Sequence, residues 1–198
     1  HSSFWYERQG GSQFIADTFA KGLNIQYNTA IQSLTLAGGK WHIADEQYDR
    51  VIWCGNIKDL VSCLRGVNID AYAADIQALP YHGTTAVFCE IDANPYSWIY
   101  LPSDRYACHR IICTGNFAPS NNASALPKRR ITATIEFTDA ISPADILANL
   151  ERMPFLPTYI THRFHPYTYP IQTAFTRQMI RSLKQALSEH DLFFTGRF

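Results

Sequence analysis

The sequence predicts an α+β fold, in which an antiparallel sheet in the middle of the chain separates two outer segments that mix strands with helices. Long β segments with an alternating apolar pattern fall between residues 81 and 137. Short apolar strands and amphipathic helices fall on both sides of them. With 198 residues, of which 46% are hydrophobic, the chain has enough apolar material for one sizeable core or two small ones.

The first part of the chain is expected to alternate short helices with short strands. An extended segment turns at Gly10-Gly11 into a helix that Ser12 caps. Three short strands are predicted next, at residues 25–27, 31–36 and 41–43. Gly38-Gly39 is typical of a hairpin turn between the last two. Residues 49–55 are an apolar run closed by glycine, which favours a strand buried on both faces, and a helix is predicted at residues 57–64.

The middle of the chain is predicted to form an antiparallel sheet. Its β segments are expected at residues 85–91, 98–101, 109–113 and 131–137. In the last segment apolar residues alternate with threonines and Glu136, which indicates one covered face and one open face. Residues 115–127 are rich in Asn, Ser, Ala and Pro and are predicted to form a surface loop.

The last part of the chain is predicted to contain two helices and two strands. Ser142-Pro143 supplies an N-cap and a first-turn proline for one helix. A strand at residues 158–164 runs into residues 165–170, whose two prolines keep the backbone extended. Apolar residues at helical spacing predict a second helix at residues 175–187, and residues 192–196 form a final apolar strand that ends in glycine.

Charge and cysteine content exclude several classes of partner and site. Seventeen basic residues cancel seventeen acidic ones, so no global field draws the chain to nucleic acid or to an anionic membrane. Five cysteines without a C-x-x-C pair indicate neither a disulfide framework nor a zinc site, and they favour the reducing cytoplasm. His162 and His165 would point to opposite faces of a strand, so no metal site is expected there.

Several blocks of the sequence, taken in order, resemble the superfamily of flavin amine oxidases and UDP-galactopyranose mutases. The blocks are residues 4–12, 23–34, 48–54, 98–102 with 109–111, 167–171 and 194–197. Their order and spacing carry the resemblance, and the last two blocks are most similar to the mutases. Glu7 stands where the superfamily usually has proline.

The resemblance implies an antiparallel substrate-binding domain at residues 57–170, inserted in a partial FAD-binding domain of Rossmann-like fold at residues 1–56 and 171–198. It implies that strands near the two ends of the chain are neighbouring parts of one nucleotide-binding fold. The superfamily opens with a strand, G-x-G-x-x-G and a helix whose amino end holds the pyrophosphate, and these 198 residues lack that motif. We therefore expect a fragment of a longer flavoprotein that binds FAD weakly or not at all by itself.

The resemblance also implies two sets of site residues. A nucleotide sugar or another small molecule is expected at Tyr100, Arg110, Tyr167 and Tyr169. FAD is expected beside Ile31, Gly196 and Arg197. Packing between a sheet and a helix is the alternative for the two late tyrosines, and core packing is the alternative for Ile31. For Arg110 we favour the alternative of a structural ion pair with Glu136.

The implied function is that of an FAD-dependent sugar-nucleotide mutase or a related flavin oxidoreductase, and the chain alone is expected to be inactive. The competing class is a non-catalytic binding module for a glycan, a nucleotide sugar or a protein partner. Flavin absorbance in the complete protein would favour the enzyme. A self-contained pocket lined by the predicted substrate residues would favour the module.

Overall fold

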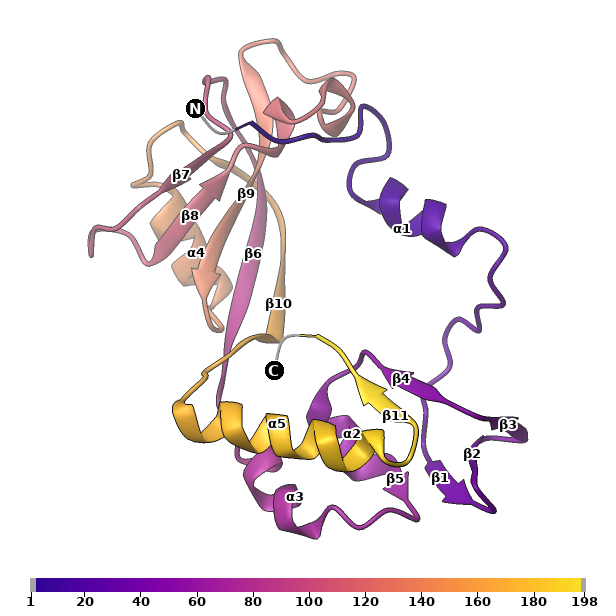
Figure 1. The fold of residues 1–198 in the computed structure, drawn as a ribbon. Coiled ribbons are helices and arrows are strands. Elements are labelled where there is room, and N and C mark those ends of the chain that lie inside the picture. The colour runs from indigo at the N-terminus through magenta and orange to yellow at the C-terminus, as the bar shows by residue number, and fades with distance from the viewer. Residues whose placement is uncertain (1–2, 197–198) are drawn as a thin grey trace. The chain divides into compact units, whose positions relative to one another are not determined.

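The computed structural model describes residues 3–196, which divide by their contacts into two compact units (Figure 1). The sheet unit comprises the chain up to Ile25 together with Gly83–Thr168. The mixed unit comprises Gln26–His82 together with the chain from Tyr169 onward. The fold is mixed α+β, as predicted, and the assignment of FAD-binding and substrate-binding roles to parts of the chain stays a prediction.

Two small sheets belong to the mixed unit. The first contains β1 (Leu34–Ala37), β2 (Lys40–Ile43), β3 (Glu46–Tyr48) and β5 (Leu64–Arg65). Its order is β3-β2-β1-β5, with β1 antiparallel to β2 and parallel to β5. Gly38 and Gly39 have positive φ angles of 57° and 77° and form the predicted hairpin turn.

The second sheet pairs β4 (Val51–Trp53) with β11 (Leu192–Phe194) in parallel. Phe193 lies opposite Ile52, and the Thr195 amide donates to the Trp53 carbonyl at 3.0 Å. This pairing confirms the expectation that the final strand shares a sheet with a strand from the first part of the chain.

Two strand predictions are wrong. Residues 25–27 form no strand and β1 begins only at Leu34, because the backbone turns at Asn28, where φ is +54°. The apolar run at residues 49–55 forms only the three-residue β4, and this strand is not buried on both faces, since Ile52 is 63% exposed.

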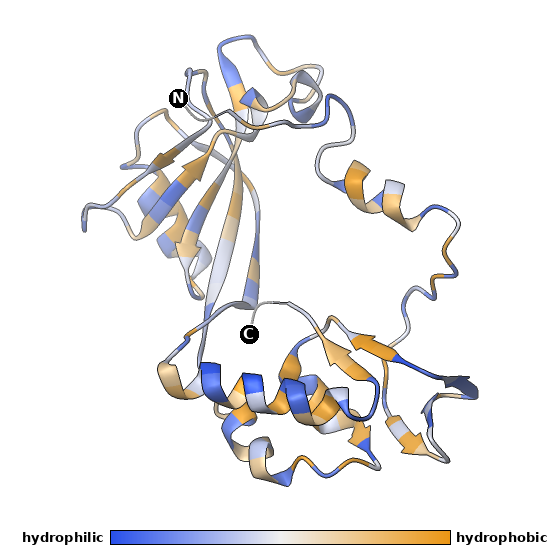
Figure 2. Ribbon diagram, viewed as in Figure 1, coloured by the Kyte–Doolittle hydropathy of each residue, from blue (hydrophilic) through white to orange (hydrophobic). Residues whose placement is uncertain are grey.

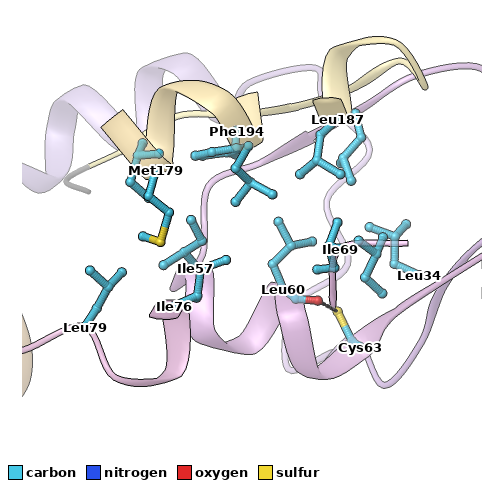
Figure 3. Packing of buried hydrophobic residues seen from close by; sticks show 14 of the residues in the cluster. Leu34, Ile57, Leu60, Cys63, Ile69, Ile76, Leu79, Met179, Leu187 and Phe194 are labelled. Carbon is cyan, nitrogen blue, oxygen red and sulfur yellow. Dashed lines mark hydrogen bonds between the residues drawn. The ribbon is translucent and has the colours of Figure 1, made fainter. Parts of the chain in front are cut away.

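One core holds the mixed unit together. It is built by the two sheets and three helices, α2 (Ile57–Cys63), α3 (Asp70–Gln77) and α5 (Ala174–Ser188). Thr173 and Thr176 form a capping box that begins α5. The helix has a hydrophilic and a hydrophobic side (Figure 2), and it buries Met179, Ile180, Leu183 and Leu187. Figure 3 shows Met179, Leu187 and Phe194 packing in one cluster with Ile57 and Leu60 of α2.

The sheet unit is organised by one long sheet. Its strands are β6 (Tyr81–Asp92), β7 (Trp98–Tyr100), β8 (Cys108–Ile112), β9 (Arg130–Thr138) and β10 (Thr158–Pro170). They lie in the order β10-β6-β9-β8-β7. The pairs β6 with β9, β9 with β8 and β8 with β7 are antiparallel, which confirms the predicted antiparallel sheet.

The helix α4 (Pro143–Leu150) covers one face of this sheet. The Ser142 hydroxyl accepts from the Asp145 amide at 3.1 Å and Pro143 begins the helix, as predicted. The second core contains side chains from α4 and from three strands: Val87, Ile111, Ile135, Ile146 and Leu150. The opposite face of the sheet therefore carries the residues that alternate with these.

The remaining elements of the sheet unit are short. The helix α1 (Gln13–Ala20) follows Gly10-Gly11 as predicted, but the Ser12 side chain makes no capping hydrogen bond, and α1 buries none of its residues. The predicted surface loop contains two 3-10 turns, η1 (Thr114–Asn116) and η2 (Pro119–Asn121). Across the described part of the chain, no helix is long and apolar enough to cross a membrane.

Gly66 and Gly38 offer a matched test of the mixed unit. Both have a positive φ, but a Cβ on Gly66 would lie 2.2 Å from the Leu36 carbonyl oxygen, whereas a Cβ on Gly38 would meet nothing within 4 Å. We expect Gly66→Ala to lower the free energy of unfolding by about 3 kcal/mol or more, because overpacking adds to backbone strain. Gly38→Ala should cost about 1 kcal/mol. Urea unfolding measures both, and equal costs would contradict the predicted clash.

The buried cysteines make the stability of the folded chain depend on pH in the alkaline range. Cys54 is exposed and the other four thiols are buried. Burial raises the pKa of the Cys89 thiol from 9.0 to about 12 and that of Cys108 to about 11. Because these folded-state pKa values are raised, the stability they contribute is complete below pH ~9 and is lost as pH rises toward the folded values.

Cys89→Ala removes one of these thiols and should flatten the alkaline loss of stability. Between pH ~8 and ~10.5 we expect the variant to lose about 2 kcal/mol less free energy of unfolding than the unsubstituted chain. Cys54→Ala, at an exposed position, serves as the control and should follow the unsubstituted chain. Urea unfolding at both pH values measures the difference, and parallel losses in all three proteins would refute the role of the buried thiol.

Candidate functional site

A row of polar side chains crosses the open face of the long sheet. Tyr100 on β7 lies opposite Arg110 on β8, which lies opposite Glu136 on β9. The Arg110 Nε donates to Glu136 Oε2 at 2.8 Å, and Arg110 Nη2 donates to the same oxygen. The favoured prediction of an Arg110–Glu136 ion pair is confirmed.

The ion pair is partly shielded from water, and Tyr100 borders it. The Arg110 side chain is 27% exposed and the Glu136 side chain 16%. Burial opposes the charge on Arg110, but hydrogen bonds to Glu136 and to the Tyr100 side chain outweigh burial and raise the pKa of the guanidinium. With Glu136 neutralising it, Arg110 can offer its remaining N–H groups to one oxygen of a ligand, but it supplies no net positive charge.

His109 joins this row through a β-bulge. The register between β8 and β9 shifts between Cys108 and Arg110, so two consecutive side chains approach the same carboxylate. The His109 Nε2 lies 3.6 Å from Glu136 Oε2, and its Nδ1 lies 3.4 Å from the Thr138 hydroxyl. Sequence reasoning missed His109, because strict alternation would place it on the covered face.

The structure separates Tyr100 from Tyr167, two of the four predicted substrate residues. Tyr167 lies on β10, and Tyr100 lies on β7, at the opposite edge of the five-stranded sheet. Four strand spacings separate these edges, which is about 19 Å. Tyr169 belongs to the mixed unit. Tyr100 and Arg110 are cross-strand neighbours, and the substrate-binding roles of all four residues stay predictions.

An aromatic cluster borders the same open face beyond Tyr100. The Phe4 ring stacks on Trp98 with centroids 5.4 Å apart, and Phe117 contacts Phe4 edge-on at 5.2 Å. Trp98 shares its face of β7 with Tyr100, two residues on. A hollow of about 780 Å³ is lined by residues 4–6, 8 and 9 and by residues 116–120, and its aromatic rings provide flat apolar surface. Sequence reasoning did not single out this hollow.

The mixed unit has a smaller hollow of about 360 Å³ beside Ile31. Its walls are residues 26 and 29–33 on one side and residues 43–46 and 48 on the other. The Tyr48 hydroxyl donates to Glu46, and this hydrogen bond, with a smaller effect of burial, raises the pKa of Tyr48. Ile31, which is predicted to lie beside a cofactor, lines this hollow, and its cofactor-binding role stays a prediction.

The polar groups that line this hollow suit only part of FAD. The carboxylates of Asp45 and Glu46 can accept from the hydroxyls of a ribose, but none of the described residues lining the hollow is basic. A pyrophosphate would meet negative charge there without a compensating cation. The residues therefore fit a nucleoside and do not fit the pyrophosphate.

The other predicted cofactor residues follow β11 in the sequence. Gly196 is exposed, with a φ of +140°. Arg197 lies outside the described residues.

Solved structures share this fold along almost the whole chain. A reduced UDP-galactopyranose mutase has a TM-score of 0.77 and 14% identity, over 98% of this chain and 46% of the other. A protein assigned as a protoporphyrinogen oxidase from Exiguobacterium sp. 255-15 has a TM-score of 0.68 and 11% identity, over 94% and 46%. A CLA-producing fatty acid isomerase from P. acnes has a TM-score of 0.66 and 13% identity, over 95% and 47%.

These likenesses confirm the predicted resemblance at the level of the fold. The chain spans just under half the length of each of the three proteins. No family model matches the sequence, and no curated protein matches it.

The Arg110–Glu136 pair should matter more to stability than an exposed pair. Glu136→Gln leaves a partly buried guanidinium without its counter-charge, and we expect it to lower the free energy of unfolding by about 1.5–3 kcal/mol. Asp49→Asn is the isosteric control, because Asp49 pairs with Lys40 in an exposed position. This substitution should lower the free energy of unfolding by less than about 1 kcal/mol. Urea unfolding compares them, and a loss no greater for Glu136→Gln than for Asp49→Asn would show that the shielded pair is dispensable.

Proposed function

We propose that this chain is part of an FAD-dependent sugar-nucleotide mutase of the UDP-galactopyranose mutase type, or of a related flavin oxidoreductase, and that it carries the substrate-binding sheet. The observation that carries the proposal is the likeness to the mutase over 98% of this chain. The five free cysteines support a cytoplasmic location. In such an enzyme bound FAD supplies the covalent and redox chemistry, and the protein positions the substrate.

Tyr100 and Arg110 are the best-supported substrate contacts. The Tyr100 side chain is exposed on the open face, and Glu136 holds Arg110 beside it. A phenol donates one hydrogen bond from a stiff side chain, and the free N–H groups of Arg110 can bind an oxygen of a diphosphate or a sugar. Tyr167 and Tyr169 are proposed as further contacts.

The chain is proposed to hold FAD incompletely. Ile31 and its hollow would take the nucleoside, and Gly196 and Arg197 would lie toward the rest of the cofactor. None of the described residues that line the hollow is cationic, which supports the expectation that the pyrophosphate is held elsewhere in the complete protein. The isolated chain is therefore proposed to be inactive.

A non-catalytic binding module is the second candidate. Trp98 and Tyr100 are 44% and 62% exposed on one sheet face, and such aromatic surfaces suit sugar rings and nucleotide bases. This module would bind a glycan or a nucleotide sugar without flavin.

Purification of the complete gene product tests the two candidates. We expect it to carry flavin absorbance and, once reduced, to convert UDP-galactopyranose to its ring isomer, whereas residues 1–198 alone should show no saturable FAD binding in the micromolar range. Flavin without this turnover would point to the related oxidoreductase. Binding of UDP-galactose by a flavin-free complete protein would favour the module and contradict the enzyme.

Tyr100→Phe tests the substrate contact within the complete protein. Loss of one hydrogen bond should weaken substrate binding about tenfold, seen as a raised KM, while the flavin content stays unchanged. Tyr96→Phe is the matched control, because Tyr96 is a similarly exposed phenol outside the row. An unchanged KM in the Tyr100 variant would remove Tyr100 from the site.

A further inference from the structure

Three side chains on the open face of the long sheet meet at one carboxylate oxygen. The Arg110 Nε lies 2.8 Å from Glu136 Oε2, Arg110 Nη2 donates to the same oxygen, and His109 Nε2 lies 3.6 Å from it. The Glu136 side chain is 16% exposed, whereas the His109 side chain is 44% exposed and can exchange protons with water. Arg110 and Glu136 cancel each other in charge, so the net charge of the three depends on whether His109 is protonated.

The β-bulge in β8 fixes this arrangement through the backbone. Cys108 is buried and lies opposite Phe137, and Arg110 lies opposite Glu136, so His109 is the additional residue of the bulged strand. The His109 carbonyl accepts from the Leu101 amide at 2.9 Å, which holds the bulge against the chain that follows β7. The approach of two consecutive side chains to one carboxylate is therefore built into the sheet.

The elements packed around His109 contribute neutral groups beside it. These groups are the Thr138 hydroxyl of β9, 3.4 Å from Nδ1, the Tyr100 phenol of β7, and Thr84 and Ala86 of β6. Beyond the end of β9, Asp139 Oδ1 accepts from the Gly83 amide at 2.7 Å. The turn between β7 and β8 carries Asp104 and Arg105, which are exposed and of opposite charge. In the part of the chain that the structure describes, Glu136 is the carboxylate that contacts His109.

We propose that His109 is a positioning residue for a ligand that carries a diphosphate, because its protonated form gives this group of side chains one net positive charge. An imidazolium at this position draws on Glu136 Oε2, which then compensates two cations in place of one. Arg110 is left with charge and N–H groups to offer to phosphate oxygens beside Tyr100. With His109 neutral the same ligand binds more weakly. The inference rests on the proposed function, since that proposal places the substrate at Tyr100 and Arg110.

The pH dependence of ligand binding by the complete gene product tests this inference. UDP-galactose is the probe, because a diphosphate esterified at both ends keeps its charge where a phosphate monoester titrates, near pH ~6. An imidazole changes its charge between pH ~5 and ~8. In calorimetric titrations at constant ionic strength, with any flavin oxidised, we expect the Kd to be about tenfold lower at pH 6 than at pH 8.

Two matched variants assign the effect to one histidine. His109→Gln retains a polar side chain that cannot take up charge, and it should bind at both pH values as the unsubstituted protein binds at pH 8. His162→Gln is the control and should keep the tenfold dependence. His162 lies on β10, separated from β8 by two strands, and its Nδ1 is 2.7 Å from the Tyr159 hydroxyl.

Proton uptake gives a second readout that does not depend on a variant folding. If protonation tightens binding, then binding must by linkage favour protonation. Titrations at pH 7 in two buffers of different ionisation enthalpy should therefore show that the unsubstituted protein takes up protons when it binds UDP-galactose. His109→Gln should take up none.

Each contrary result has a distinct meaning. An equal Kd at pH 6 and pH 8, or binding without proton uptake, would overturn the inference and leave flavin content and turnover as evidence for the enzyme. A full pH dependence in His109→Gln would assign the effect to another group and overturn it as well. A flavin-bearing protein that does not bind UDP-galactose at either pH would overturn both the inference and the proposed substrate contacts. The expected pH dependence in a flavin-free protein would support the inference and contradict the flavoenzyme.

Discussion

The parallel pairing of β4 with β11 is the constraint on which the mixed unit depends. It places the last strand of the chain against a strand from its first third, so that α5, which precedes β11, packs over α2 and α3. The segments before and after the long sheet thereby share one core. Without this pairing the buried face of α5 and the apolar side chains of β11 would have no partner in the unit.

Local patterns in the sequence predicted much of this fold. Period-two alternation identified β9, and an N-cap with a first-turn proline identified α4, because both signals act within a few residues. The helix α3 was missed, since its cap is indirect, with the Asn68 side chain accepting from the Asp70 amide, and only Ile76 is buried. The exposure of Ile52 could not be predicted, because a run of apolar residues does not tell which faces of its strand are covered.

The candidate site shows the same division between local and long-range information. An arginine among apolar strand residues needs an anion, so the Arg110–Glu136 pair followed from the sequence. The position of Tyr167 relative to Tyr100 did not follow, because strand order is a property of the whole sheet. His109 was missed for a third reason, since a bulge inserts one residue and redirects the side chain.

The open face of the long sheet and the exposed face of the β4–β11 sheet differ in how well water solvates them. Glu136 accepts hydrogen bonds from Arg110, and the polar groups of Tyr100, Arg110 and Glu136 can also be solvated, so the open face of the long sheet is stable in water. Ile52 and Phe193 make an apolar pair, and exposure costs free energy that covering them would recover. A ligand that comes and goes would leave that cost in place for most of the time. A cover that stays in place removes that cost, whereas the open face of the long sheet needs no cover to be stable in water.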